Sequence, residues 1–412
     1  MARTLTSMKA ITNRRGILLL MSLGVAVFVA VVGATSLVRS VHETGIGRRN
    51  ADQQRAFYLA EAGLDRASMN LRTPDEAADD LLTATLPAGS SAVVGSYAIV
   101  QAADSLDPLR WTVTSTGASG GISRRIEAVY TLTPQSIFQS ALFADVQVNI
   151  TGSAQTDSFD SRLGAYEDDP NDPGYNHGSN GDVGTNATAY GGMTVGGSIF
   201  IEGQMAVGPG VDPPASIVNG CGDPPDCSSF VTGDPWIAAQ STSVPMPAVT
   251  VPQGLAPWCT DFTVQGSTTV TLTPTGGPFG NGTYCYRDLT IQGNANLTAT
   301  GPVTIYLTHQ LTAQGNSVVG VPSDPTQMLF KMTSTAGAVL EQVIQGNNTF
   351  YGAIYGPDAE VNIQGNAEIY GSVIAEVINV QGNAQLHYDE ALAMETRVVN
   401  QYKRAVTSWR EY

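Results

Sequence analysis

A tripeptide that recurs through the second half of the chain constrains its fold more than any other feature. Gln-Gly-Asn or Gln-Gly-Ser occurs six times, at successive spacings of 27, 22, 31, 19 and 17 residues. Short β-prone runs separated by glycine at a period near 20 residues indicate a β-solenoid, in which glycine supplies a corner with positive φ. A β-sandwich is the alternative, but a sandwich does not require the same tripeptide at each turn. The predicted corner glycines are Gly266, Gly293, Gly315, Gly346, Gly365 and Gly382.

We assign residues 135–388 to this solenoid body. Looser echoes of the repeat occur earlier, in the segments 148–153 and 192–203. Residues 151–257 are rich in Gly, Pro, Asp and Asn, which are residues typical of turns and loops. We therefore expect this stretch to form loops that decorate the first coils of the solenoid, not a separate domain.

The charge is distributed unevenly along the 412 residues. Residues 1–72 carry ten basic and four acidic side chains, a formal charge of +6, whereas residues 135–390 carry three basic and 23 acidic ones, a charge of −20. A strongly acidic body argues against nucleic acid as a partner, because nucleic-acid binding needs a basic surface. It also repels polyuronates, which are substrates of many β-solenoid enzymes.

An uncharged apolar run of 23 residues, Gly16–Val38, predicts a membrane span. At about 1.5 Å per residue in a helix, this run is long enough to cross a hydrocarbon core of roughly 30 Å. A secretory signal peptide is the alternative, but its apolar region is usually shorter. The run also continues into helical sequence, where an apolar stripe recurs at alternating steps of three and four: Phe57, Ala60, Leu64, Ala67 and Leu71. We therefore expect one long helix over residues 17–72, loosened near Gly45–Gly47.

Two motifs in this region resemble a known family. Arg14-Arg15-Gly16-Ile17 is similar to the leader junction of type IV pilin precursors, and the block from Gly47 to Leu64 resembles the signature of the PilX-type minor pilins, which are type IV pilus assembly proteins. The signature residues are Asn50, Asp52, Ala56, Phe57, Ala60, Glu61 and Leu64.

The resemblance implies how the chain is processed and where it resides. Residues 1–16 would be a leader that a prepilin peptidase removes after Gly16, and Ile17 would become the methylated amino terminus. The helix, including Leu20, Met21 and Val38, would first anchor the subunit in the bacterial inner membrane and later pack with other pilins in a filament. The body would lie in the periplasm or on the cell surface, with a surface or carbohydrate receptor as its partner.

The chain departs from the family at one position. Most major pilins have glutamate at the fifth mature position, whereas this chain has Met21. Pilins that are present in low copy or at the filament tip are the members that can lack this glutamate. An ordinary signal anchor with a helical stalk is the alternative interpretation of the whole region.

The segments on either side of the solenoid body complete the predicted α+β fold. Residues 73–134 contain three β-prone runs, at 96–102, 109–116 and 122–132, and we expect a small antiparallel pilin-like sheet packed on the second half of the long helix. For residues 389–412, Leu392, Val399, Tyr402, Val406 and Trp409 suggest an apolar helical stripe. We therefore expect a carboxyl-terminal helix that caps the solenoid or packs back on it, with a partner-binding helix as the alternative.

The four cysteines all lie in the body, and they predict disulfides more readily than a zinc site, because no Cys-X-X-Cys motif or histidine pair accompanies them. Cys221 could pair with Cys227, and Cys259 with Cys285; free buried cysteines are the alternative. Disulfides persist outside the cytosol, which favours an outward body. A second group, Glu167, Asp168, Asp169 and Asp172, is interpreted as solvated turn acids, with calcium binding as the alternative.

No nucleophile elbow, phosphate-binding loop or HExxH motif is present in the sequence. We therefore expect no catalytic residues and no cofactor, and a non-enzymatic minor pilin-like protein in a type IV pilus or related filament, acting in assembly or adhesion. A membrane-anchored adhesin that never enters a filament is one alternative, and a carbohydrate-active β-helix enzyme is the other.

Overall fold

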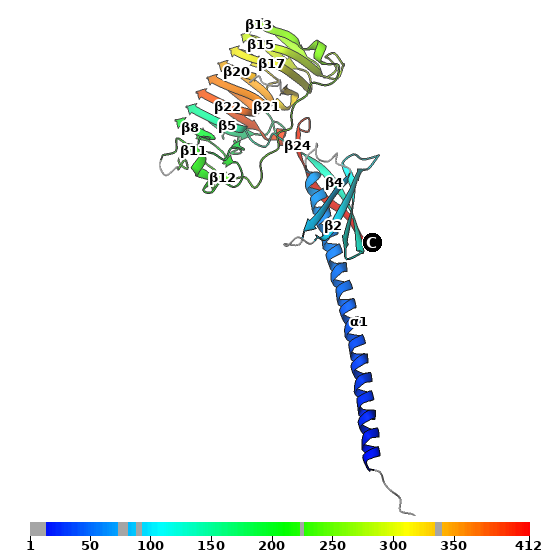
Figure 1. Ribbon diagram of the computed structural model, residues 1–412. Coiled ribbons are helices and arrows are strands. Elements are labelled where there is room, and N and C mark those ends of the chain that lie inside the picture. The colour runs from blue at the N-terminus through cyan, green and yellow to red at the C-terminus, as the bar shows by residue number, and fades with distance from the viewer. Residues whose placement is uncertain (1–13, 73–80, 88–92, 223–225, 334–339) are drawn as a thin grey trace, which may run out of the picture. The chain divides into compact units, whose positions relative to one another are not determined.

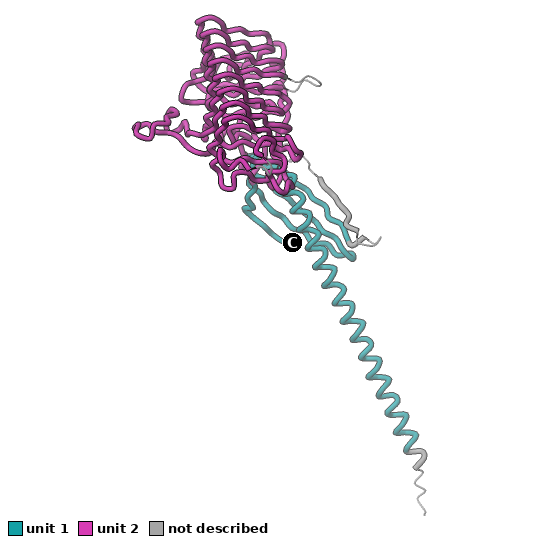
Figure 2. The backbone as a smooth tube through the Cα atoms, turned by 90° about the vertical axis from the view of Figure 1, so that its left-hand side faces the viewer, with its two compact units in different colours: residues 1–71, 76–132, 404–412 teal, residues 72–75, 133–403 magenta. Residues whose placement is uncertain are grey.

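A computed structural model describes residues 14–72, 81–87, 93–222, 226–333 and 340–412. The chain divides into two compact units, coloured separately in Figure 2. Unit 1 comprises residues 1–71, 76–132 and 404–412, and unit 2 comprises residues 72–75 and 133–403. Most of the predicted leader and the start of the predicted small-sheet region, residues 1–13 and 73–80, lie outside the described residues.

Unit 1 begins with one unbroken helix, α1, which spans Arg14–Asn70 (Figure 1). Its 57 residues confirm the long helix predicted from the sequence. The predicted loosening at Gly45–Gly47 is wrong, because the helix continues through both glycines. A glycine in a helix interior costs only about 1 kcal/mol, which the flanking helix formers can offset.

The second half of α1 packs on a five-stranded sheet of order β1-β2-β3-β4-β24. The first four strands pair antiparallel, each with the next, so the three strands predicted from the sequence are confirmed and one more precedes them. The β3–β4 hairpin turns at Gly120 and Gly121, both with positive φ. The strand bounds are β1 Leu81–Pro87, β2 Val93–Ala103, β3 Arg110–Ser119, β4 Ile122–Ser136 and β24 Val399–Glu411.

Small residues bring the helix and the sheet into close contact. A Cβ atom added to Gly117 of β3 would lie 2.0 Å from the carbonyl oxygen of Ala56, and one added to Gly63 of α1 would lie 2.1 Å from Oγ of Ser115. Larger side chains at these glycines would push the two layers apart. The core between the layers is formed by the fully buried Ala56, Ala60, Ala67, Leu71, Ile99, Val113 and Ile126.

The predicted carboxyl-terminal helix over residues 389–412 is wrong. Residues 390–394 form a short 3-10 helix, η5 (Glu390–Met394), and residues 399–411 form strand β24. Arg125 of β4 and Tyr412 exchange backbone hydrogen bonds, with N···O distances of 3.4 and 2.8 Å, so β24 pairs along β4 as the last strand of the unit 1 sheet. Valine, threonine, tyrosine and tryptophan favour strands, and the open edge of β4 supplies the backbone partners that a strand needs.

Unit 2 is the predicted solenoid. Its strands pair parallel and in register from coil to coil, and Figure 1 shows β13, β15, β17, β20, β22, β5 and β8 as one stacked series. The strands of the first segment are β5 Leu142–Gly152, β6 Gln155–Phe159, β7 Val183–Thr185, β8 Met193–Gly197, β9 Phe200–Ile201, β10 Met205–Val207, β11 Val218–Asn219 and β12 Ile237–Ala239. Those of the second are β13 Thr260–Gly266, β14 Thr269–Leu272, β15 Thr283–Gly293, β16 Asn296–Ala299, β17 Val303–Gly315, β18 Val318–Val319, β19 Met328–Met332, β20 Leu340–Gly346, β21 Thr349–Gly365, β22 Glu368–Gly382 and β23 Gln385–Asp389. The described residues between these strands include the 3-10 turns η2 Pro214–Ile217, η3 Ala256–Trp258 and η4 Pro325–Gln327.

The order of the coils in the stack differs from their order in the chain. Strand β5 pairs with β22 on one side and with β7 and β8 on the other. Residues 142–239 therefore stack against the last coil of the chain, and the stack then restarts at β13 and returns coil by coil to β22. Residues 151–257 contain the loops predicted from the sequence, but short strands of the stack, β6 to β12, alternate with these loops.

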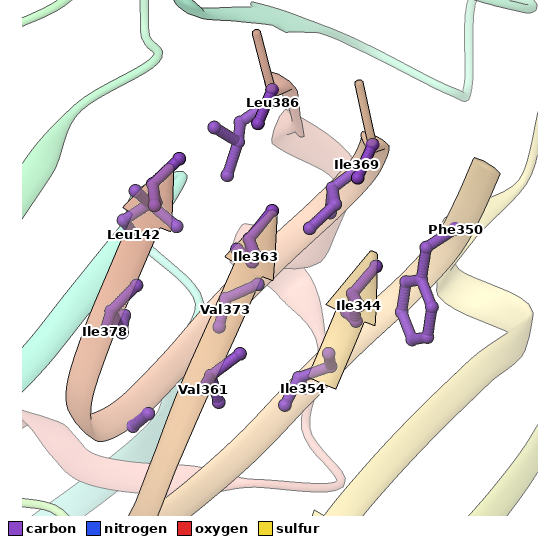
Figure 3. Close-up of a cluster of buried hydrophobic side chains, with 14 of the residues drawn as sticks. Leu142, Ile344, Phe350, Ile354, Val361, Ile363, Ile369, Val373, Ile378 and Leu386 are labelled. Carbon is purple, nitrogen blue, oxygen red and sulfur yellow. The ribbon is translucent and has the colours of Figure 1, made fainter. Parts of the chain in front are cut away.

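Columns of inward-facing apolar side chains run through the solenoid. Each column joins equivalent positions of successive coils. One lies just before the corner glycines and another just after them. Figure 3 shows part of both columns. The first column consists of Val264, Ile291, Ala313, Ile344, Ile363, Val380, Ile150 and Val195, and each of these side chains is buried. Burial of roughly 1.5–3 kcal/mol per large aliphatic side chain makes this column a main source of the stability of unit 2.

Candidate functional site

The first half of α1 presents an uninterrupted apolar surface. Leu20, Met21 and Val38 are each about two-thirds exposed, and none of the apolar window in this part of the helix is buried. Gly16 and Ile17, the predicted cleavage positions, lie close to the start of the same helix. Among the described residues, α1 is the one helix long and apolar enough to cross a membrane. An exposed apolar surface of this extent needs lipid or another apolar helix to cover it.

The residues of the family signature divide into two groups in unit 1. Ala56, Ala60 and Leu64 are buried against the sheet and make the close approach of the layers possible. The others lie nearer the surface. Asn50 and Phe57 line a surface groove together with Arg124 and Glu411, and Glu61 is partly exposed. The carboxylate of Asp52 lies beside Gly120 and 3.6 Å from the guanidinium of Arg55.

The predicted corner glycines are confirmed as corners. All six have φ between +74° and +97°, and they align in register along the stack. Gly152 and Gly197 extend this glycine column by two further coils, both with φ of +97°. The looser echoes of the repeat seen in the sequence are therefore true corners that lack the glutamine.

Two rows of amide side chains flank the glycine column. We call Gln265, Gln292, Gln314, Gln345, Gln364 and Gln381 the glutamine row. Within it, Gln292 donates to Gln265, Gln314 to Gln292 and Gln345 to Gln314, with Nε2···Oε1 distances of 3.1, 3.0 and 2.9 Å. In the asparagine row, Asn347 donates to Asn316, Asn366 to Asn347 and Asn383 to Asn366, at 3.3, 3.0 and 3.1 Å.

A shallow groove of about 1110 Å³ follows the glutamine row across five coils. Glutamines, glycines and one threonine, Thr268, line it, and no charged residue contributes to its lining. In a body with a formal charge of −20, this groove is an uncharged strip.

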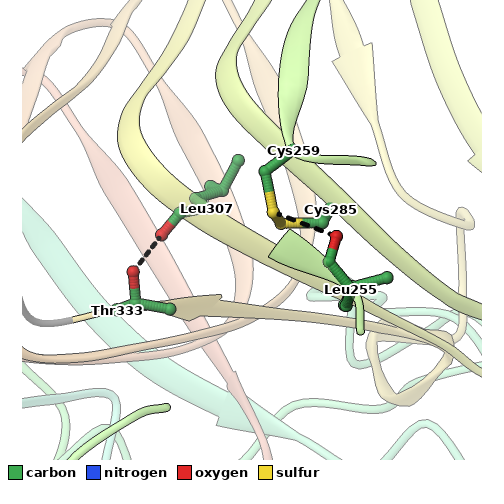
Figure 4. Close-up of a disulfide and its surroundings, with 5 residues drawn as sticks. All are labelled: Leu255, Cys259, Cys285, Leu307 and Thr333. Atoms are coloured by element: carbon green, nitrogen blue, oxygen red, sulfur yellow. Dashed lines mark hydrogen bonds between the residues drawn. A yellow bond between two sulfur atoms is a disulfide. The ribbon is translucent and has the colours of Figure 1, made fainter. Parts of the chain in front are cut away.

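Both predicted cysteine pairs are disulfides. Cys221 is bonded to Cys227, and Cys259 to Cys285. The second bridge joins the residue before β13 to β15, the next strand in the stack, and Figure 4 shows it beside Leu255, whose carbonyl oxygen lies 3.6 Å from Sγ of Cys259. This bridge links the coil of β13 covalently to the next coil, which supplies the one strand partner that β13 has among the described residues.

The acidic group at 167–172 uses its carboxylates to shape turns. Glu167 accepts a hydrogen bond from the backbone of Asp169, and Asp172 accepts one from the backbone of Gly174. Hydrogen bonds from the backbone and side chain of Asn171 lower the pKa of Asp169. Asp168 is exposed, and within the described ranges no three Asp, Glu, His or Cys side chains converge as a metal-binding group. The geometry thus fits turn acids, and calcium binding stays an untested alternative.

A cluster that the sequence did not reveal lies where the first and last coils meet. His387 Nδ1 lies 2.6 Å from Asp157 Oδ1, and the hydroxyl of Tyr166 donates to Asp157 Oδ2 at 2.7 Å. The imidazole is held between Tyr166 and Tyr370, with ring centroids 4.0 and 4.6 Å away, and burial raises the pKa of both tyrosines. No sequence signal could identify this cluster, because His387 and Asp157 are 230 residues apart.

Comparisons with known proteins give a partial family match. Residues 252–395 match the model of a domain of unknown function, DUF7305. No curated protein sequence matches the chain. The fold is similar to that of the competence-associated pilin ComZ from Thermus thermophilus, at 16% identity and a TM-score of 0.31, covering 88% of this chain and 97% of that one. It is also similar to the DUF3494 domain of ice-binding protein 1 from Shewanella frigidimarina, at 16% identity and a TM-score of 0.25, covering 62% and 95%. Similarity this weak carries no argument about function.

Proposed function

We propose that the chain is a non-enzymatic minor pilin-like subunit of a type IV pilus or a related filament, present in low copy or at the tip. The observation that carries this proposal is the division of α1. Its first half is apolar and exposed, and its second half is buried on an antiparallel sheet by the alanines and the leucine of the signature. One helix thus offers a membrane anchor that can become a filament contact, and a rigid attachment to a folded unit.

The partners follow from this role. A prepilin peptidase would cut after Gly16, the inner membrane would hold the helix before assembly, and other pilins and assembly proteins would cover it afterwards. The solenoid would be displayed in the periplasm or on the surface, because two disulfides in unit 2 are stable outside the reducing cytosol. A folded unit of 275 residues on each subunit favours low copy number, since repeating it along a filament needs much space.

A second candidate function is a membrane-anchored adhesin that never leaves the membrane. Met21 favours it, because this position lacks the glutamate that pairs with a neighbouring amino terminus in bulk pilins. Both candidates share the anchor and the displayed body, and processing at Gly16 separates them.

Coexpression with a prepilin peptidase tests the proposal directly. We expect the full chain to lose residues 1–16, as measured by the intact mass of the protein, and Gly16→Val to block the cut. Gly33→Ala is the matched control, because a Cβ atom there meets no other atom within 4 Å and the position is remote from the cut. An uncut wild-type chain in the presence of an active peptidase would favour the permanently anchored adhesin.

A further inference from the structure

We propose that the groove along the glutamine row is a binding site for an uncharged polysaccharide chain lying parallel to the stack axis. This inference rests on the proposed function, because it names the class of partner that the displayed body would contact. The binding itself is a property of unit 2.

The spacing of the groove defines the geometry of its ligand. The groove has one glutamine on each of five coils, and the four steps between them, at about 4.8 Å each, give a track of roughly 19 Å. A ligand that matches this track must repeat its polar groups once per coil. An extended peptide advances only about 3.3 Å per residue, so it falls out of step with the glutamines. A hexopyranose unit of an extended glycan advances by a distance comparable to one coil.

The hydrogen-bonding capacity of the groove defines the chemistry of its ligand. In the middle of the glutamine row, each amide uses one N–H and one oxygen lone pair along the row, which leaves a second N–H and a second lone pair. Sugar hydroxyls both donate and accept, so they can use both. The backbone in β15, β17, β20 and β21 is already paired with strands on both sides, so these strands offer no free edge to a peptide.

The charge of the groove defines the class of glycan. The lining contains only Gln, Gly and Thr, so it offers no cation to a uronate or sulfate group. The body around it has a formal charge of −20, which repels anionic polymers. A neutral glycan needs no cationic partner and is not repelled by the body. An acidic glycan lacks a cationic partner in the groove and is repelled.

Affinity electrophoresis of the detergent-solubilised full-length protein tests the site. The native gels contain hydroxyethylcellulose as the neutral probe or polygalacturonate as the anionic probe. We expect retardation by hydroxyethylcellulose alone. The pair Gln314→Ala and Gln345→Ala is expected to weaken binding about tenfold, because two amides that each contribute a modest hydrogen bond are removed.

The asparagine row supplies the matched control. Asn347→Ala with Asn366→Ala also removes contacts within an amide row, but these side chains do not line the groove, so binding should change less than about twofold. The thermal unfolding midpoint of each variant reports folding, and Gln292→Ala alone, with an expected loss of about threefold, replaces the double variant if that one does not fold.

Three results would overturn the proposal. They are no retardation by hydroxyethylcellulose, equal losses in the glutamine and asparagine variants, and stronger retardation by polygalacturonate. None of these results bears on cleavage after Gly16, so failure of the binding site and failure of the pilin-like role remain distinguishable.

Discussion

Neighbouring glycines in β8 show how strictly the corner conformation selects its residue. Gly197 occupies the glycine column with φ of +97°, and a Cβ atom there would lie 2.1 Å from the carbonyl oxygen of Gly152 in the adjacent coil. Gly196, one residue earlier, has no positive φ, and the nearest atom to its added Cβ is 3.9 Å away on Thr151. The corner therefore requires glycine for both its backbone angle and its contact with the next coil, whereas its neighbour does not.

We expect Gly197→Ala to lower the free energy of unfolding of unit 2 by about 2 kcal/mol or more, because the left-handed backbone costs roughly 1–2 kcal/mol and the steric conflict adds to it. Gly196→Ala, the matched control, should change it by less than about 0.5 kcal/mol. Urea denaturation followed by tryptophan fluorescence measures both. Equal effects of the two substitutions would show that the column does not depend on the corner geometry.

At the residue scale, repetition decides what the sequence can reveal. The six corner glycines and both disulfides were predictable, because a recurring tripeptide and a small set of cysteines restrict the choices. The contact between Asp157 and His387 was not predictable, because neither residue belongs to a recurring motif. Only the stacking of the first coil on the last one brings them together.

At the scale of elements, the carboxyl-terminal segment shows how tertiary structure overrides a local pattern. Spacings of three and four between Val399, Tyr402, Val406 and Trp409 favour a helix, but the same residue types favour strands, and the open edge of β4 decided between them. Arg404 adds a link to α1 through its hydrogen bond of 2.9 Å to Oγ of Ser68. The order of coils was unpredictable for a related reason, because corners this similar can stack on one another in any order.

Truncation after Lys403 should therefore expose the edge of β4. We expect hydrogen exchange of residues 122–132 to accelerate about tenfold or more, which corresponds to a loss of roughly 1.4 kcal/mol in local stability. Residues 349–382 of unit 2 provide an internal control, and their exchange should not change, since their strand partners lie within the solenoid. Unchanged exchange in residues 122–132 would contradict the pairing of β24 with β4.

On the scale of the whole molecule, the chain inserts one unit into another. Strand β4 leads into unit 2, and the chain returns from it to form β24, the next strand of the same sheet. The uneven charge of the sequence follows this organisation, because the basic segment of residues 1–72 belongs almost wholly to unit 1 and the acidic segment of residues 135–390 belongs to unit 2. The edge of β4 is therefore covered by a strand that follows unit 2 in the chain.

The mature amino terminus of the protein in sheared surface filaments tests the central claim most directly. Mass spectrometry of the amino-terminal peptide is expected to show a chain that begins at Ile17 and carries one methyl group on its amino nitrogen. The same peptide should be absent from filaments of a strain that expresses Gly16→Val. A chain that retains residues 1–16, found in the membrane fraction and not in the filaments, would contradict the pilin-like role.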